Sequence, residues 1–145
     1  MAEVSSETLH ASCVAIDGRA VLIEGRSGAG KSDLALRLID RGGVLVSDDY
    51  TICTRKDGVL CGAPPATIAG KMEVRGIGVI AMPHVERVPI ALLVQIADTP
   101  PRMPDAPGHR RIAGVNIPEI ALPALEPSAP IKVELALSHL SGGKP

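Results

Sequence analysis

The sequence feature that most constrains the fold is the segment Gly25-Arg26-Ser27-Gly28-Ala29-Gly30-Lys31-Ser32. Its glycines let the backbone curl around a phosphate group and point its amides inward, where side chains would obstruct it. Lys31 adds a point charge, and the Ser32 hydroxyl can ligate magnesium. The pattern predicts a loop that binds ATP or a related nucleotide together with Mg²⁺. The candidate binding residues are Gly25, Arg26, Ser27, Gly28, Ala29, Gly30, Lys31 and Ser32.

The segments on either side of this loop fit the same prediction. Residues 20–24 form an apolar run that predicts a strand, and residues 31–41 predict a helix because Leu34 and Leu38 share one face. A strand, loop and helix in this order place the phosphates at the helix N-terminus, where the helix dipole favours anions. This context favours a binding loop over the alternative, a glycine-rich turn without a ligand.

Two acidic residues follow the next apolar run. Residues 44–46 predict a short buried strand, and Asp48 and Asp49 come directly after it. A right-handed crossover predicts that this strand lies parallel to and beside the loop strand, so that both carboxylates face the nucleotide. One could hold Mg²⁺ while the other deprotonates an attacking hydroxyl. The alternative is a turn or helix cap.

The rest of the chain predicts a mostly β scaffold. The sequence Asp17-Gly18 suits the positive φ angles of a hairpin between residues 9–16 and the loop strand. Later strand-like runs are punctuated by prolines; they cover residues 50–54, 59–62, 76–82, 88–97, 112–122 and 131–137. We therefore predict an α/β domain with one or two helices: a predominantly β scaffold with a phosphate-loop strand and helix, and a mixed sheet with hairpins.

The predicted domain organisation is simple. Residues 9–140 form a single domain, while residues 1–8 and 141–145 are expected to be flexible ends. The proline-rich stretch 98–111 is too long for a simple turn, which predicts either a mobile functional loop or a disordered one.

Composition excludes several classes of function. The chain has no Phe or Trp, Tyr50 is its only aromatic residue, and 15 basic residues face 16 acidic ones, so we expect no nucleic-acid partner. No apolar run approaches the roughly 18 residues of a membrane span, so we expect no membrane partner. Three widely spaced cysteines and a polar start without a secretory signal predict a cytoplasmic protein with free thiols.

Other polar residues are ambiguous when judged by their pattern alone. His10 lies in the strand that pairs with the loop strand and could approach the same edge, although a lone histidine is more often structural. The segment 73–78 combines an acid, a base and two glycines, and also fits an ordinary strand entry. Arg102, together with His109 and Arg110-Arg111, could neutralise phosphate charge, although exposed arginines are usually only solvated.

Taken together, these segments resemble the C-terminal catalytic domain of the bacterial HPr kinase/phosphorylase family over about residues 9 to 137. The similar segments, in order, are Leu9-His10-Ala11, the loop from Gly25 to Ser32, Val46-Ser47-Asp48-Asp49, Gly62-Ala63-Pro64-Pro65, Glu73-Val74-Arg75-Gly76-Ile77-Gly78 and Val115-Asn116-Ile117-Pro118-Glu119-Ile120. The segment 73–78 is similar to the signature sequence of that family.

The resemblance implies transfer of the ATP γ-phosphate to a serine of HPr, a phosphocarrier protein of the sugar phosphotransferase system, and the reverse dephosphorylation. It implies Asp48 as the catalytic aspartate and His10 as the histidine that supports it. It implies Ser32, Asp49 and Glu73 at the magnesium site. Arg102 corresponds to a family arginine tied to dephosphorylation.

The chain also departs from the family pattern. Only about eight residues precede the histidine strand, and the helical segment after about His139 is missing, so we expect a minimal catalytic domain. The resemblance implies a possible homo-oligomer, because the family forms hexamers. Two other functions stay open: a small-metabolite kinase or nucleotide hydrolase, and a nucleotide-sensing module without catalysis.

Overall fold

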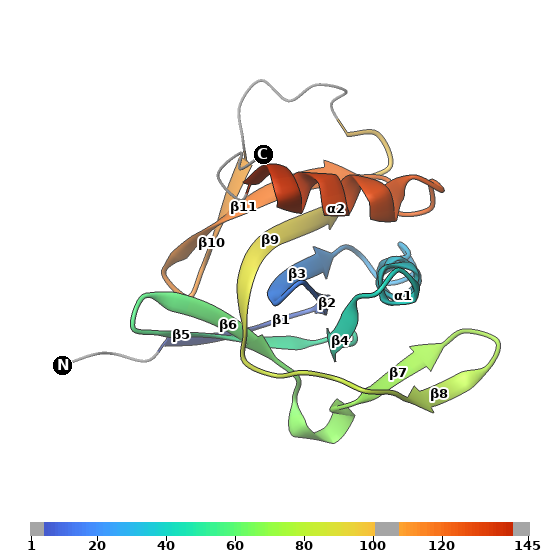
Figure 1. Ribbon diagram of the computed structural model, residues 1–145, viewed down its shortest axis with the longest axis horizontal. Coiled ribbons are helices and arrows are strands. Elements are labelled where there is room, and N and C mark those ends of the chain that lie inside the picture. Colours follow the sequence, from blue (N-terminus) through green and yellow to red (C-terminus); the bar gives the residue numbers. More distant parts are fainter. Residues whose placement is uncertain (1–4, 101–107, 141–145) are drawn as a thin grey trace.

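The computed structural model describes residues 5–100 and 108–140 (Figure 1). Its strands are β1 (Ser5–Leu9), β2 (Ala11–Ile16), β3 (Arg19–Glu24), β4 (Val44–Ser47), β5 (Thr51–Lys56), β6 (Val59–Ala63), β7 (Lys71–Val74), β8 (Gly78–Ala81), β9 (Val88–Ile96), β10 (Gly108–Ile112) and β11 (Val115–Leu122). Its helices are α1 (Lys31–Asp40), the short 3-10 helix η1 (Ala66–Ile68) and α2 (Ala129–Leu140).

Most strands belong to one mixed sheet that branches at β9. The order is β1-β5-β6-β9-β3-β2-β4, and β11 also pairs with β9 and carries β10. Strand β9 runs parallel to β3 and β11 and antiparallel to β6. Strands β7 and β8 form a separate antiparallel hairpin, which extends from the sheet at the lower right of Figure 1. The predicted α/β class, with a mixed and predominantly β scaffold, is confirmed.

Local turn chemistry explains two of the hairpins. Asp17 and Gly18 have φ angles of 51° and 79°, and they join β2 to β3 as predicted. Asp57 and Gly58 have φ angles of 53° and 78° between β5 and β6. These Asp-Gly pairs adopt the left-handed backbone that tight hairpins require.

The position of β4 corrects one prediction. Strand β4 pairs with β2 in an antiparallel ladder, and β2 in turn pairs antiparallel with β3. Strand β4 therefore runs parallel to the loop strand β3 but is not its neighbour, because β2 lies between them. The C-terminal ends of β3 and β4 still open on the same edge of the sheet.

Two hydrophobic clusters lie on the two faces of these central strands. Alternate residues of β3 enter different clusters: Val21 and Ile23 join one, and Ala20 and Leu22 the other. The first cluster contains buried apolar residues of both helices, among them Leu34, Leu38, Val133 and Leu137. The second contains residues of β5, β6, β10 and β11, so β3 is covered on both sides, as expected for a continuous apolar strand.

The last secondary-structure prediction was wrong, because residues 131–137 belong to α2 rather than to a strand. Their apolar residues alternate with period two, which is typical of a strand. The structure buries only Val133 and Leu137 of that run, four residues apart on one helical face. Pro130 lies in the first helical turn, where the missing N–H is tolerated. Within the described ranges, no helix has the length and apolar character needed to cross a membrane.

Two segments predicted to lack structure contain strands. Residues 5–8, expected to belong to a flexible N-terminus, pair with β5 as part of β1. Residues 108–111, expected to lie in a loop, pair with β11 as part of β10. The predicted flexible tail 141–145 lies outside the described residues, as does Arg102.

Candidate functional site

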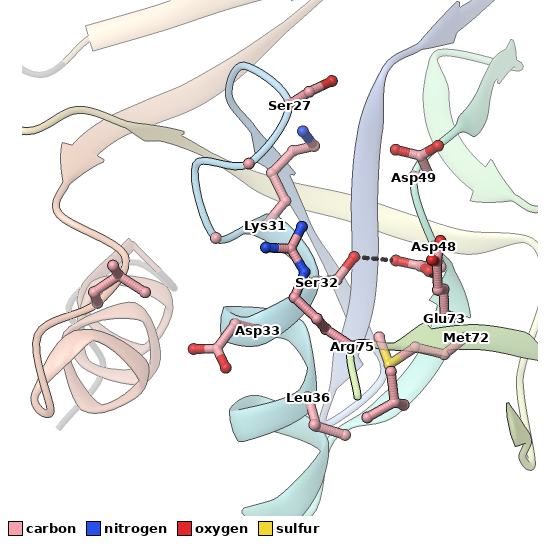
Figure 2. A pocket seen from close by; sticks show the side chains of 14 residues that line it. Ser27, Lys31, Ser32, Asp33, Leu36, Asp48, Asp49, Met72, Glu73 and Arg75 are labelled. Carbon is pink, nitrogen blue, oxygen red and sulfur yellow. Dashed lines mark hydrogen bonds between the residues drawn. The ribbon is translucent and has the colours of Figure 1, made fainter. Parts of the chain in front are cut away.

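A cleft of about 560 Å³ opens between the Gly25–Ser32 loop, the end of β4 and the β7–β8 hairpin. This volume lies in the range of small-molecule sites. In Figure 2, the labelled side chains of the loop and α1, of the end of β4 and of the β7–β8 hairpin surround the same space. Its polar lining includes Lys31, Ser32, Asp48, Asp49, Glu73 and Arg75.

The Gly25–Ser32 loop adopts a backbone that requires glycine at two positions. Gly28 and Gly30 have φ angles of 80° and 104°. Gly30 is the N-cap of α1 and has no side chain with which to cap the first turn, so its amides are available to an anion. A Cβ atom on Gly30 would also lie 3.1 Å from the Cβ of Ala124.

Lys31 is held inside this loop. Only 6% of the residue is exposed, and its Nζ donates hydrogen bonds to the carbonyl oxygens of Gly25 (2.9 Å) and Arg26 (3.2 Å). The ammonium group therefore lies where the loop backbone curls, surrounded by carbonyls that neutralise part of its charge. An anion in the loop would be a better partner than these neutral oxygens.

The two aspartates after β4 have opposite surroundings, and Asp48 is the enclosed one. Its Oδ1 accepts hydrogen bonds from Ser32 Oγ (2.7 Å) and Ser12 Oγ (3.2 Å), and its Oδ2 accepts one from the amide of Glu73 (3.1 Å). Asp48 is 6% exposed. Its carboxylate therefore joins β2, α1 and β7, and Figure 2 shows it facing Ser32.

Asp49 instead points toward His10. His10 Nε2 lies 2.9 Å from Asp49 Oδ1, and the side chains of His10 and Asp49 are 40% and 56% exposed. The imidazole stacks on the ring of Tyr50, with the ring centroids 4.8 Å apart. The expected support of Asp48 by His10 is therefore wrong. The sequence could not distinguish two adjacent carboxylates, because their directions depend on the backbone turn between them.

Two arginines outside the loop, Arg75 and Arg110, differ in their contacts. Arg75 lines the cleft, is exposed, and has no ion pair or hydrogen bond with the rest of the described chain. Arg110 is a structural residue, because it forms ion pairs of 2.8 Å with both Glu24 and Glu119. The hydrogen bond to Glu24 raises the pKa of its guanidinium. Arg110 thus stabilises the arrangement of β3 and β11 by pairing with one glutamate from each strand.

Ser12 is a site residue that the sequence analysis missed. It is fully buried in β2, donates to Asp48 Oδ1, and accepts a hydrogen bond of 3.1 Å from the backbone amide of Asp49. The sequence signal for Ser12 was its position two residues after His10, in the strand expected to pair with the loop strand. Without the pairing of β2 with β4, that signal does not connect Ser12 to the aspartates.

The donor set at Ser32 and Asp48 fits magnesium. A hydroxyl and a carboxylate are hard oxygen ligands, and Mg²⁺ is typically bound through one or two carboxylates, several waters and substrate phosphates. Among residues 5–100 and 108–140, no three His, Cys, Asp or Glu residues are grouped to hold a metal ion. The described residues thus offer part of a coordination shell, as suits an ion that arrives with a nucleotide.

The thiols behind the cleft do not contribute a nucleophile. Cys13 follows Ser12 in the chain, and Cys53 lies in β5; both are fully buried. Burial raises the pKa of Cys53 to about 12 and raises that of Cys13 further. Because the thiolate is the reactive form, both cysteines act as small core residues.

Comparison with known proteins connects this geometry to one family. The HPr Serine kinase C-terminal domain family matches residues 2–133. The HPr kinase/phosphorylase of Limosilactobacillus reuteri (strain DSM 20016) is 35% identical over 133 residues, which cover 81% of this chain and 41% of the relative. That of Clostridium botulinum (strain Eklund 17B / Type B) is 47% identical over 72 residues, covering 50% of this chain and 24% of the relative. The chain spans less than half the length of these curated relatives.

The fold is also similar to a solved structure. The Hpr(Ser) kinase/phosphatase from Coxiella burnetii superposes with a TM-score of 0.78 and 31% sequence identity, covering 92% of this chain and 89% of that one. The similarity therefore extends over most of the chain.

Proposed function

The chain belongs to the HPr Serine kinase C-terminal domain family, and from this premise we propose that it transfers the γ-phosphate of ATP to a serine of an HPr-like phosphocarrier protein. One observation carries the proposal. Asp48 faces the Ser32 hydroxyl at the phosphate-loop side of the cleft, while Asp49 faces His10 at its open side. Phosphoryl transfer needs one group that holds the metal–phosphate group and another that accepts a proton, and the two must lie close together.

The loop binds the β- and γ-phosphates. Lys31 Nζ exchanges its bonds to the Gly25 and Arg26 carbonyls for phosphate oxygens, and the free amides of the first α1 turn add further donors. Arg75, which has no ion pair within the described residues, lies on the hairpin side of the cleft and would face the same charge.

Ser32 and Asp48 are the residues that would hold magnesium between the loop and β4. The Ser32 hydroxyl, which donates its proton to Asp48, would offer a lone pair to the ion, and Glu73 would add a carboxylate from the hairpin, as the resemblance implies. Bound there, Mg²⁺ would neutralise charge on the β- and γ-phosphates.

Asp49 is the proton acceptor in this proposal. As the serine oxygen attacks the γ-phosphorus and ADP leaves, Asp49 takes the hydroxyl proton, while His10 holds Oδ1 and leaves Oδ2 free for the acceptor. This exchanges the roles that the resemblance suggested for the two aspartates. The reason is that both oxygens of Asp48 already accept hydrogen bonds within the protein, whereas Asp49 is open to an incoming hydroxyl.

We also predict three further features. They are dephosphorylation of the phosphoserine by the same site, a role for Arg102 in that dephosphorylation, and a homo-oligomer.

The test is incubation of the protein with ATP, Mg²⁺ and the HPr-type proteins of its own organism, followed by mass spectrometry for phosphoserine. We expect one phosphoserine on an HPr-type protein, and none with the Lys31→Ala variant, which removes the phosphate-binding charge. ATP consumption without any protein acceptor would instead identify a metabolite kinase or hydrolase. Bound nucleotide that never turns over would identify a sensing module; either result overturns the proposal.

A further inference from the structure

The turn between the two aspartates is strained. The amide of Tyr50 donates to the carbonyl of Asp48 at 2.8 Å, across Asp49 with a φ angle of 72°. An i to i+2 hydrogen bond around a residue with positive φ is the rarer and more strained form of γ-turn. Such a backbone persists only where the surrounding structure holds it.

Ser12 supplies one of the bonds that hold this turn. Its hydroxyl oxygen accepts from the Asp49 amide at 3.1 Å, and the same hydroxyl donates to Asp48 Oδ1 at 3.2 Å. The residue is fully buried. A single group therefore contacts the side chain of one aspartate and the backbone of the next, from a strand paired with β4.

This double contact explains why the two carboxylates diverge. The bond to Asp48 keeps that carboxylate turned toward Ser32, and the bond to the Asp49 amide keeps the peptide rotated so that the next side chain points to His10. Without the hydroxyl, the amide of Asp49 would lose its partner and the turn could relax. Relaxation would move both carboxylates together.

We propose that Ser12 is the positioning residue that assigns different roles to Asp48 and Asp49, one toward the metal–phosphate group and one toward the acceptor hydroxyl. The inference rests on the proposed phosphotransfer function. It predicts that loss of the hydroxyl affects two measurable quantities at once: the magnesium-dependent part of ATP affinity and the rate of transfer.

The test compares three variants. Ser12→Ala removes the hydroxyl without adding volume, and Ser12→Thr keeps it. Thr51→Val is the matched control, because Thr51 is also fully buried and its hydroxyl donates to the Ala11 carbonyl at 2.7 Å, without contact to either aspartate. ATP affinity is measured by titration calorimetry with Mg²⁺ and with EDTA, and kcat and KM are measured with the HPr-type acceptor.

We expect Ser12→Ala to lower kcat by about tenfold or more and to weaken ATP binding only when Mg²⁺ is present, by a similar factor. Ser12→Thr should retain both properties, and Thr51→Val should lower thermal stability while leaving both unchanged. Equal losses in Ser12→Ala and Thr51→Val would overturn the inference, as would an unchanged magnesium dependence in Ser12→Ala. Should Ser12→Ala not fold, Ser12→Cys, a close match in shape with a weaker donor, takes its place.

The ATP titrations and the phosphotransfer assays together separate this inference from the proposed function. If the wild-type protein phosphorylates none of the HPr-type proteins, the proposed function fails, yet the ATP titrations still measure whether Ser12 orients Asp48. If the wild type transfers phosphate and the Ser12 variants match it, the inference alone fails.

Discussion

Two groups of polar residues at one side of the cleft, named here its inner and outer walls, differ in how fully they are hydrogen-bonded. Ser32, Asp48 and Asp49 line the cleft itself, and the other members of the two groups lie against these residues. The inner wall, defined by Ser12, Ser32 and Asp48, is enclosed: Ser12 is fully buried and Asp48 is 6% exposed. The outer wall, defined by His10, Asp49 and Tyr50, is open to solvent, with the Asp49 side chain 56% exposed. Asp48 and Asp49 both follow β4 directly, so the two walls share one turn and differ in the direction of its two carboxylates.

This difference suits two kinds of chemistry. A carboxylate fixed by three donors cannot turn to meet a new partner without breaking bonds, so the inner wall can present one constant geometry to a metal–phosphate group. A half-exposed carboxylate with one fixed oxygen can admit an acceptor. The comparison therefore assigns binding to the inner wall and proton transfer to the outer one, and substitutions on each wall should separate the two.

The largest effect should come from Asp49→Asn. An amide cannot take up the hydroxyl proton, so we expect kcat for phosphotransfer to fall by about 100-fold or more, while ATP affinity changes little. Single-turnover phosphorylation of an HPr-type protein and ATP titration measure the two quantities. A different outcome would identify Asp48 as the base. In that case Asp49→Asn would keep normal turnover, and Asp48→Asn would lose turnover while its ATP affinity stayed unchanged.

Asp48→Asn should have the next largest effect, and of a different kind. The new amide NH₂ would face the hydroxyl and amide donors that now meet the carboxylate, and the metal would lose a negative ligand. We expect ATP binding in the presence of Mg²⁺ to weaken by about 10- to 100-fold, with little change in EDTA. Thermal stability should fall as well, because a buried donor is left unpaired. Magnesium-independent loss of ATP binding would contradict this account.

The sequence predicted the phosphate loop better than the surroundings of the two aspartates. The loop, its strand and α1 are contiguous in the chain, so glycine spacing and the Leu34–Leu38 face were enough to place Ser32 at the helix start. The partner of β4 is a long-range property. The sequence of a four-residue strand does not indicate whether β2 or β3 lies beside it. The prediction placed β4 beside β3, whereas it pairs with β2.

The outer wall depended on one backbone angle. The pairing of His10 with Asp49 follows from the φ angle of 72° at Asp49, and aspartate adopts such angles only occasionally, so the sequence did not signal it. The error in residues 131–137 has a different origin: alternating apolar residues fit a strand, and only packing against the first hydrophobic cluster selected the helix.

His10→Ala should have a smaller effect than either aspartate change. Among the described residues, the imidazole holds one oxygen of Asp49 and has no hydrogen bond or ion pair with the loop, so the base would remain present and less well oriented. We expect kcat to fall by about tenfold, with unchanged magnesium-dependent ATP affinity. His10→Asn, which keeps a short hydrogen-bonding side chain, is the control. A loss in His10→Ala as large as that in Asp49→Asn would mean that the histidine itself exchanges the proton.

The smallest effect should come from the side chain of Tyr50, which contacts His10 through its ring. The Tyr50 ring lies nearly parallel to the imidazole of His10, at an interplanar angle of 21°, and such stacking contributes about 0.5–1.5 kcal/mol beyond the area it buries. Tyr50→Leu should therefore lower kcat by about twofold to tenfold through a less restricted His10, whereas Tyr50→Phe should not. The two substitutions should have no effect when combined with His10→Ala, because the stacked partner is then absent. If Tyr50→Leu lowers kcat as much in the His10→Ala background as in the wild type, Tyr50 acts on the acceptor protein directly. The outer wall would then extend beyond the three residues that define it.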